Sequence, residues 1–317
     1  MGVAPKYKVT DDYPDKESVS YTKGGVPISN PSFAQIKEND GLYTMTVTAT
    51  DKAGNTTTKT VSFTVNRFGS YFEYNDAIKE AMGNAFQNID KDLIITEKDI
   101  SKLTETENKI YKDGKAIENS AQTKEDGIEE GYNVYRHVFS KDLFSDEGAY
   151  EINVVSKDDA GNEMESADEN GKITFYVDRT APILSVDGID PKGIKGETAE
   201  LTINTSDLLT GVKEVTATAN GSAVALKDNG SGSYTMTVHE GLRQPIHVTA
   251  TDGAGNQAEF DDTVSVSSSS FSLFFDRFKL WLGLGAAALA AAIAGFIIAK
   301  RRRDDDEEEE EDEDDNN

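Results

Sequence analysis

The sequence contains no cysteine and only one tryptophan in 317 residues. Without cysteine the chain can form no disulfide and can offer no thiolate to zinc or to a substrate. The three histidines, His137, His239 and His247, do not stand at the spacing of metal ligands. The sequence motifs of a nucleophile elbow, a P-loop and a zinc protease are also absent. We therefore predict that the chain is not an enzyme.

Basic residues are scarce as well. There are 32 lysines and arginines against 58 aspartates and glutamates, which gives a net charge of −26. A surface this acidic repels the phosphates of nucleic acid, so nucleic acid is not expected as a partner. Residues 304–315 are all acidic, and such a run is expected to be solvated and disordered.

One motif, D-x-A-G-N, occurs three times, at residues 51–55, 158–162 and 252–256. Repetition at long, similar intervals indicates an array of similar domains. Each copy stands between segments in which apolar residues alternate with others, as in Tyr43 to Ala49 before the first copy, and this period is typical of half-buried strands. The motif therefore predicts a turn between two antiparallel strands, in which glycine supplies a positive φ and Asp and Asn bind the turn backbone.

The same motif allows a second interpretation, a calcium site, because carboxylate and amide oxygens are ligands that calcium prefers. One acid in each turn is too few, so a neighbouring domain or loop would have to supply further ligands. No other cofactor is predicted. The candidate calcium ligands are Asp51, Asn55, Asp158, Asn162, Asp252 and Asn256.

Residues 280–299 carry no charge, and a helix of this length would span about 30 Å, the thickness of a bilayer core. Trp281 suits one membrane interface, and the bases 300–303 at the other end predict a cytoplasmic C-terminus. We expect a single-pass protein of the cell membrane with residues 1–279 outside, in contact with the lipid bilayer. Small residues four apart suggest weak self-association of this helix, through Gly283, Ala287, Ala291 and Gly295.

The repeats resemble the bacterial Ig-like arrays found on surface proteins of Gram-positive bacteria. The resemblance rests on the tyrosine-strand-D-x-A-G-N core and on two junctions, 63–70 and 177–182, and it covers most of residues 20–267. It implies tandem Ig-like β-sandwiches. Repeat 3 departs from the pattern, because Gln244 stands where repeats 1 and 2 have Tyr43 and Tyr150. The C-terminus also lacks an L-P-x-T-G sorting motif, so a retained membrane helix is expected as the anchor.

The predicted fold class is all-β: tandem Ig-like β-sandwiches followed by one transmembrane α-helix and a disordered acidic tail. Only about 50 residues precede the first motif, so repeat 1 is expected to be truncated and the chain to be the C-terminal part of a longer exported protein. The serine-rich residues 265–270 are expected to form a flexible linker. The predicted segments are repeat 1 at 1–66, repeat 2 with an insertion at 67–179, repeat 3 at 180–267, a juxtamembrane linker at 268–279, the transmembrane helix at 280–299, and a basic stop-transfer with acidic cytoplasmic tail at 300–317.

An array of small β domains favours a structural function. We expect an extracellular stalk that presents upstream domains away from the membrane. Two alternatives stay open. The repeats could be an adhesin that binds a host protein, a cell-wall or other glycan ligand, or calcium. The chain could also be the anchor region of a surface enzyme whose catalytic domain lies upstream.

Overall fold

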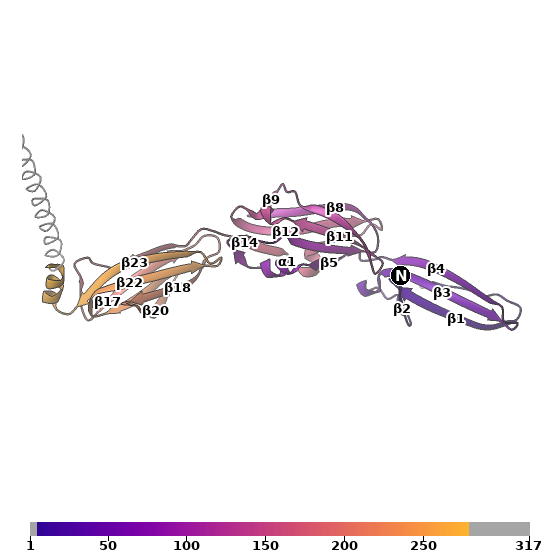
Figure 1. Ribbon diagram of the computed structural model, residues 1–317, viewed down its shortest axis with the longest axis horizontal. Coiled ribbons are helices and arrows are strands. Elements are labelled where there is room, and N and C mark those ends of the chain that lie inside the picture. Colours follow the sequence, from indigo (N-terminus) through magenta and orange to yellow (C-terminus); the bar gives the residue numbers. More distant parts are fainter. Residues whose placement is uncertain (1–4, 279–317) are drawn as a thin grey trace, which may run out of the picture. The chain divides into compact units, whose positions relative to one another are not determined.

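The computed structural model describes residues 5–278 and consists mainly of antiparallel strands (Figure 1). The predicted all-β class is confirmed for these residues. The chain divides into two compact units. The first holds the residues up to Thr180 with Leu208–Thr210 and Gly253–Asn256, and the second holds Ala181–Asp207, Gly211–Asp252 and the residues from Gln257 on.

Several predictions fall outside the described residues. These are the membrane helix at 280–299, its self-association residues and the tail at 300–317. Within residues 5–278, no helix has both the length and the apolar character needed to cross a bilayer.

Repeat 1 is a single four-stranded sheet in the first unit. Its strands are ordered β2-β1-β3-β4 and are all antiparallel. One face carries four pairs of hydroxyl groups that hydrogen-bond each other across β3 and β4, from Thr44 with Ser62 to Thr50 with Thr56. The strands are β1 (Pro14–Lys23), β2 (Val26–Ile28), β3 (Gly41–Asp51) and β4 (Thr56–Val65), with a 3-10 turn η1 (Lys37–Asn39) before β3.

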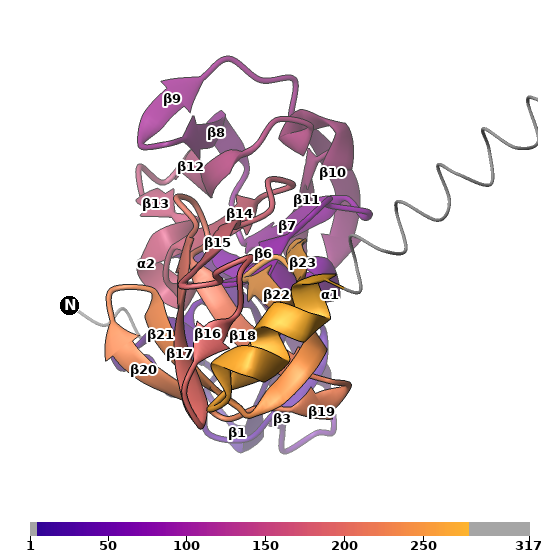
Figure 2. The ribbon, with the colours of Figure 1, turned by 90° about the vertical axis from the view of Figure 1, so that its left-hand side faces the viewer.

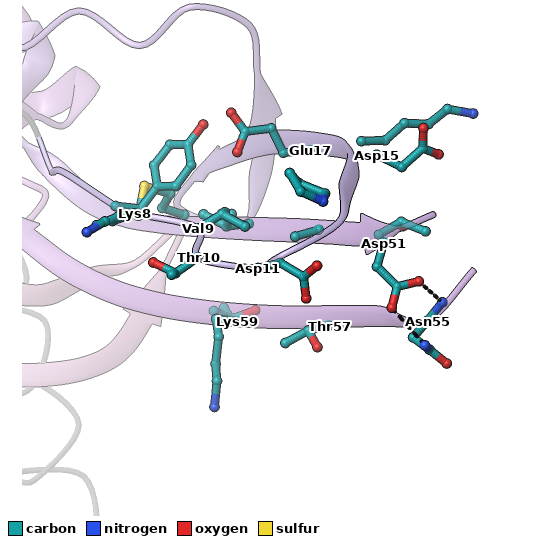
Figure 3. Close-up of a pocket in the computed structure, with 18 of the residues that line it drawn as sticks. Lys8, Val9, Thr10, Asp11, Asp15, Glu17, Asp51, Asn55, Thr57 and Lys59 are labelled. Atoms are coloured by element: carbon teal, nitrogen blue, oxygen red, sulfur yellow. Dashed lines mark hydrogen bonds between the residues drawn. The ribbon is translucent and has the colours of Figure 1, made fainter. Parts of the chain in front are cut away.

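The opposite, apolar face of this sheet has no second sheet packed on it in the described chain. Phe33 covers one end, where Tyr43 stacks on Phe63 with 5.5 Å between ring centroids. At the other end, a hollow of about 850 Å³ lies between the sheet and residues 7–11, lined by Met45 and Val47 among others (Figure 3). Repeat 1 is thus half of a sandwich, and its apolar face is partly covered by irregular chain.

Repeat 2 is a two-layered sandwich. One sheet is ordered β10-β11-β7-β5, and the other runs β6-β14-β12-β8-β9 with β13 beside β12. Ile95 and Phe139 from the first sheet share one core with Ile152 and Phe175 from the second. The elements are β5 (Tyr71–Tyr74), α1 (Asp76–Ala81), β6 (Ala85–Phe86), β7 (Leu93–Asp99), β8 (Leu103–Lys112), β9 (Lys115–Ile117), β10 (Gln122–Glu129), β11 (Tyr132–Phe139), η2 (Lys141–Phe144), β12 (Gly148–Asp158), β13 (Glu163–Glu165), α2 (Ser166–Asn170) and β14 (Ile173–Val177).

Repeat 3, in the second unit, has the same two layers. Its sheets are ordered β15-β17-β21-β20 and β16-β23-β22-β18-β19, and Leu201 and Met236 of one sheet pack with Val248 and Val264 of the other. The strands are β15 (Ile183–Asp187), β16 (Ile194–Lys195), β17 (Thr198–Ser206), β18 (Val212–Ala219), β19 (Ser222–Ala223), β20 (Leu226–Gly230), β21 (Ser233–His239), β22 (Gly241–Asp252) and β23 (Gln257–Ser267).

The tyrosines before the first two motifs have equivalent positions. Tyr43 and Tyr150 are both buried, and each donates its hydroxyl hydrogen to a backbone oxygen four residues earlier, that of Asn39 at 2.7 Å and that of Asp146 at 2.9 Å. This contact is a tyrosine corner of the kind found in Ig-like sandwiches. It explains why the tyrosine recurs at a fixed distance from the motif in repeats 1 and 2.

The serine-rich segment after repeat 3 differs from the prediction. Strand β23 continues through Ser267, because Val264 and Val266 alternate with the serines and are fully buried in the core. The chain then turns into a helix over residues 270–278, the orange helix in Figure 2. The flexible linker expected at 265–270 is therefore wrong for its first three residues, and the described part of the segment 268–279 is largely helical.

Candidate functional site

The D-x-A-G-N motifs form the predicted turns between antiparallel strands. In the first copy, Asp51 Oδ1 accepts hydrogen bonds from the backbone nitrogens of Ala53 and Asn55, and Oδ2 accepts one from Asn55 Nδ2 at 2.8 Å. The hydrogen bonds from Asn55 hold the pKa of Asp51 below its usual value. Gly54 has a φ of 88°, a conformation that glycine adopts at least cost.

The second copy has the same two hydrogen bonds between its aspartate and asparagine, and one further contact. Asp158 Oδ1 accepts from the backbone nitrogen of Asn162, and Oδ2 accepts from Asn162 Nδ2 at 2.7 Å. Oδ2 also accepts from Asn66 Nδ2 at 2.7 Å. Asn66 directly follows the last strand of repeat 1, so this turn of repeat 2 holds the end of the preceding repeat.

A second buried acid, Asp99, shares the amide of Asn66. Asn66 Nδ2 lies 3.4 Å from Asp99 Oδ1 and 2.8 Å from Ser101 Oγ. Burial is the main cause that raises the pKa of Asp99 to about 6, and the negative charges of Asp158 and Glu97 raise it further, although hydrogen bonds from Ser70 and Ser101 oppose the shift. Two buried carboxylates therefore lie on either side of one amide group.

The polar cluster continues into the core of repeat 2. Glu97 and His137 are fully buried, and His137 Nε2 lies 2.8 Å from Glu97 Oε2. The other ring nitrogen, Nδ1, lies 2.9 Å from Thr123 Oγ1. Glu97 Oε1 accepts hydrogen bonds from the hydroxyls of Ser70 and Ser156. The sequence did not reveal this network, because alternation in β7 and β11 predicts which residues face inward but not which strands are neighbours.

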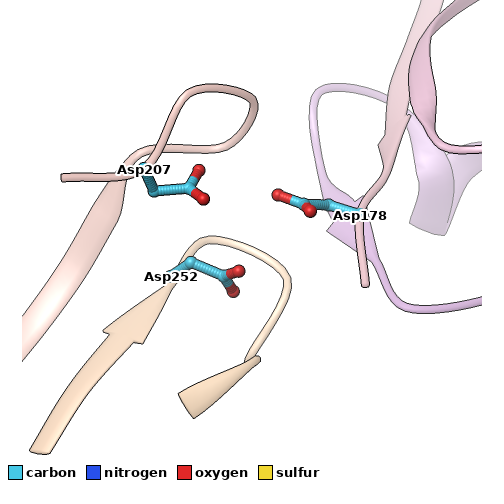
Figure 4. A group of neighbouring side chains, drawn as sticks. All are labelled: Asp178, Asp207 and Asp252. Atoms are coloured by element: carbon cyan, nitrogen blue, oxygen red, sulfur yellow. The ribbon is translucent and has the colours of Figure 1, made fainter. Parts of the chain in front are cut away.

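Repeat 3 has a pair of acids at the corresponding positions. Asp207 follows β17 as Asp99 ends β7, and Asp252 opens the third motif as Asp158 opens the second. Carboxylate oxygens of Asp207 and Asp252 lie within 4.8 Å of each other (Figure 4). Figure 4 also draws Asp178, a residue of the first unit.

Asp178 directly follows β14, the last strand of repeat 2, as Asn66 directly follows β4, the last strand of repeat 1. Its buried carboxylate accepts from the backbone nitrogen of Thr180 and, at 2.7 Å, from Thr210 Oγ1. Its backbone oxygen accepts from Asn256 Nδ2 at 2.9 Å. Thr210 and Asn256 come from repeat 3 in the sequence, but both belong to the first compact unit. Asn256 of the third motif thus binds Asp178 near the end of repeat 2. Asn162 of the second motif binds Asn66 at the end of repeat 1, with its Nδ2 3.2 Å from Asn66 Oδ1.

The junction between repeats 1 and 2 is also fixed by Asp40. Its buried carboxylate accepts from the backbone nitrogens of Arg67 and Phe68 and from Arg67 Nε at 2.8 Å. The Arg67 side chain, 22% exposed, donates as well to the backbone oxygens of Phe33 and Ile36. From repeat 2, the hydroxyl of Tyr132 donates to the backbone oxygen of Asp40. Residues of both repeats therefore hold the connecting segment.

Among the predicted calcium ligands, Asp51 pairs with Asn55 and Asp158 with Asn162, whereas Asp252 lies near Asp207 and Asn256 binds the backbone oxygen of Asp178. Each motif aspartate in the first two copies lies beside the asparagine of its own turn, and Asp158 and Asn162 are joined by Asn66 and Asp99. The sequence did not identify Asp99 or Asp207 as partners. The sequence feature that could have identified them is an acid at the end of a predicted strand, at matching places in repeats 2 and 3. Calcium binding stays a prediction.

Comparison with known proteins supports the repeat type. Residues 9–67 match the family model described as a bacterial Ig-like domain. A search of curated proteins found no match. The match covers most of repeat 1, and repeats 2 and 3 are two-layered β-sandwiches with the same motif turn, in agreement with the predicted Ig-like repeats.

Three solved structures show distant similarity. Fibronectin(III)-like modules of CbhA from Clostridium thermocellum have 16% identity over 62% of this chain and 95% of theirs, with a TM-score of 0.29. A titin Ig tandem has 14% identity over 64% and 98%, with a TM-score of 0.28. SGBP-B of a Bacteroides ovatus mixed-linkage glucan utilization locus, in complex with a mixed-linkage heptasaccharide, has 16% identity over 81% and 60%, with a TM-score of 0.20. At these scores the similarities carry no functional argument.

Proposed function

We propose that this chain is a non-enzymatic, membrane-anchored bacterial surface protein whose Ig-like repeats form an extracellular stalk that presents upstream domains. The observation that carries the proposal is the junction between repeats 1 and 2. Asp40 and Asp158 hold residues 66–68 from both sides through hydrogen bonds to buried carboxylates. Such bonds contribute about 1.5–3 kcal/mol each, so the two repeats are coupled and do not behave as domains on a loose tether.

The C-terminal sequence supports the anchorage. Residues 280–299 are long and apolar enough to span a bilayer, and four bases follow directly. Lysine and arginine favour the cytoplasmic side, so the repeats would lie outside the cell. In sealed membrane vesicles of this orientation, added trypsin should reach the repeats but not residues 300–303.

Trypsin also tests the junction, because Arg67 is a cleavage site held by Asp40. In the full chain, cleavage after Arg67 should be slow, and the Asp40→Ala variant should be cleaved there at least several-fold faster. Asp90→Ala, a substitution of an exposed acid in repeat 2, is the matched control and should behave like the wild type. Equal cleavage after Arg67 in the wild type and in Asp40→Ala would contradict a fixed junction.

A second candidate function is calcium binding by the repeats, favoured by the acid pairs Asp99 with Asp158 and Asp207 with Asp252. Two carboxylates with amide and backbone oxygens are a ligand set suited to calcium, which takes 6–8 oxygens. Calcium should then raise the melting temperature of the full chain by several degrees and a chelator should reverse the shift. Asp99→Asn combined with Asp207→Asn should abolish the shift and Asp90→Asn should retain it. An unchanged melting temperature in calcium would remove this candidate.

A further inference from the structure

The helix over residues 270–278 carries four phenylalanines on one side. Successive residues of an α-helix are rotated by about 100°, so positions i, i+3, i+4 and i+7 fall within an arc of about 100°. The rings contact one another along this arc, with centroids 4.7 Å apart for Phe271 and Phe275 and 6.1 Å apart for Phe274 and Phe278. We call these four residues the phenylalanine stripe.

The opposite side of the helix is fixed to repeat 3. Leu273 is buried, and its Cδ2 atom lies in space that a side chain at Gly193 would need. Asp276 Oδ1 accepts from Arg243 Nε at 2.5 Å and Oδ2 accepts from Ser265 Oγ at 3.0 Å. The Asp276 backbone oxygen also accepts from Arg243 Nη2 at 2.7 Å. These contacts set the rotation of the helix and turn the phenylalanine stripe away from the sandwich.

The phenylalanine stripe is unusually exposed for such apolar side chains. The exposed fractions are 70% for Phe271, 62% for Phe274, 45% for Phe275 and 49% for Phe278. A contiguous aromatic patch on a surface marks a contact with a protein or a membrane. The sequence favours a membrane. An uncharged run begins at Leu280, two residues after Phe278, and the basic Arg277 and Lys279 can meet lipid headgroups.

We propose that the phenylalanine stripe lies in the interface of the lipid bilayer and, through Leu273 and the Arg243–Asp276 pair, holds repeat 3 at a fixed tilt to the membrane. The proposal rests on the membrane anchorage proposed above and adds a contact to it. An amphipathic helix in the interface plane buries its apolar side at the boundary of headgroups and acyl chains. Repeat 3 would then contact the membrane surface through this helix, in addition to being connected to the transmembrane segment.

The absence of cysteine makes a direct test simple, because one introduced cysteine is the only site for a thiol-reactive fluorophore. The full chain, labelled with an environment-sensitive dye at Phe274→Cys, is reconstituted in phosphatidylcholine vesicles with and without lipids that carry a quencher. Arg277→Cys is the matched control. It is on a different side of the same helix, yet it is closer in sequence to the apolar run. Ser231→Cys, in the turn before β21, is the distant control.

The dye at position 274 should be quenched several-fold more than the dye at position 277, and the dye at position 231 should not be quenched. Replacing Phe271 and Phe275 by serine should reduce the quenching at position 274. If the chain floats with the vesicles but position 277 is quenched as much as 274 or more, the helix does not lie on its phenylalanine stripe and the inference fails alone. If the chain does not float with vesicles, the anchorage itself is overturned, and the inference with it.

Discussion

Single residues show how one turn motif can serve two purposes. Asp51 and Asp158 bind equivalent backbone groups within their turns, so both stabilise a hairpin. Asp158 is buried and binds Asn66 as well, whereas Asp51 is partly exposed. The same five letters therefore close a hairpin in repeat 1 and also fix a junction in repeat 2.

This difference predicts unequal costs for the same substitution. Asp51→Ala should lower the free energy of unfolding only slightly, because the freed donors can bind water. Asp158→Ala should cost about 3 kcal/mol, because it removes a buried carboxylate that accepts from Asn162 and, across the junction, from Asn66. Urea denaturation of the two variants measures both values, and equal losses would contradict a role for Asp158 at the junction.

Asp99 predicts a dependence of stability on pH. Its pKa is raised to about 6 in the folded protein and is about 3.9 in the unfolded chain. The folded state therefore binds more protons between these values, and this group lowers stability as the pH rises through about 4 to 6. The full shift corresponds to about 3 kcal/mol.

Asp99→Asn should remove this decrease in stability with rising pH. The free energy of unfolding of the variant minus that of the wild type, measured by urea denaturation, should be more positive at pH 7.5 than at pH 5. Asp90→Asn is the control and should leave the pH profile of the wild type in place. An Asp99→Asn profile parallel to that of the wild type would show that Asp99 titrates normally.

Among the elements, the sheet of repeat 1 stands apart. In repeats 2 and 3 the sheet that carries the motif packs against a second sheet around a shared core. The corresponding face of β1, β3 and β4 has Phe33 at one end and the hollow beside Met45 and Val47 at the other. A single sheet is marginally stable unless its apolar face is packed.

Amide hydrogen exchange should therefore be faster in β1, β3 and β4 than in β12 of repeat 2 or β22 of repeat 3. The measurement compares protection factors within one full-length sample, so all strands share the same conditions. Equal protection of β3 and β22 would show that the face of repeat 1 is covered in solution.

The elements also show what the sequence could predict. Period-two alternation is a local property, so the strands beside each motif and the turns between them were predictable. The pairing of Asp158 with Asp99 depends on two sheets whose strands are far apart in sequence, and the burial of His137 depends on the same arrangement. The helix over 270–278 had a visible i, i+3, i+4, i+7 pattern, but the serines before it suggested a linker.

For the molecule as a whole, the proposed stalk depends on junctions that transmit orientation from one repeat to the next. Within the first unit, Asp40, Asn66, Arg67 and Asp158 form such a junction. The phenylalanine stripe would serve the same purpose between repeat 3 and the membrane. The D-x-A-G-N turn of repeat 2 then acts as part of a joint of the array.

A distance measurement across the junction tests this proposal most directly. Spin labels at Thr58→Cys in repeat 1 and Lys124→Cys in repeat 2, both exposed positions of the first unit, can be compared by pulsed electron paramagnetic resonance in the full chain. We predict a single narrow distance distribution that broadens in Asp40→Ala but not in Asp90→Ala. A broad distribution in the wild type would contradict the coupled repeats and, with them, the stalk.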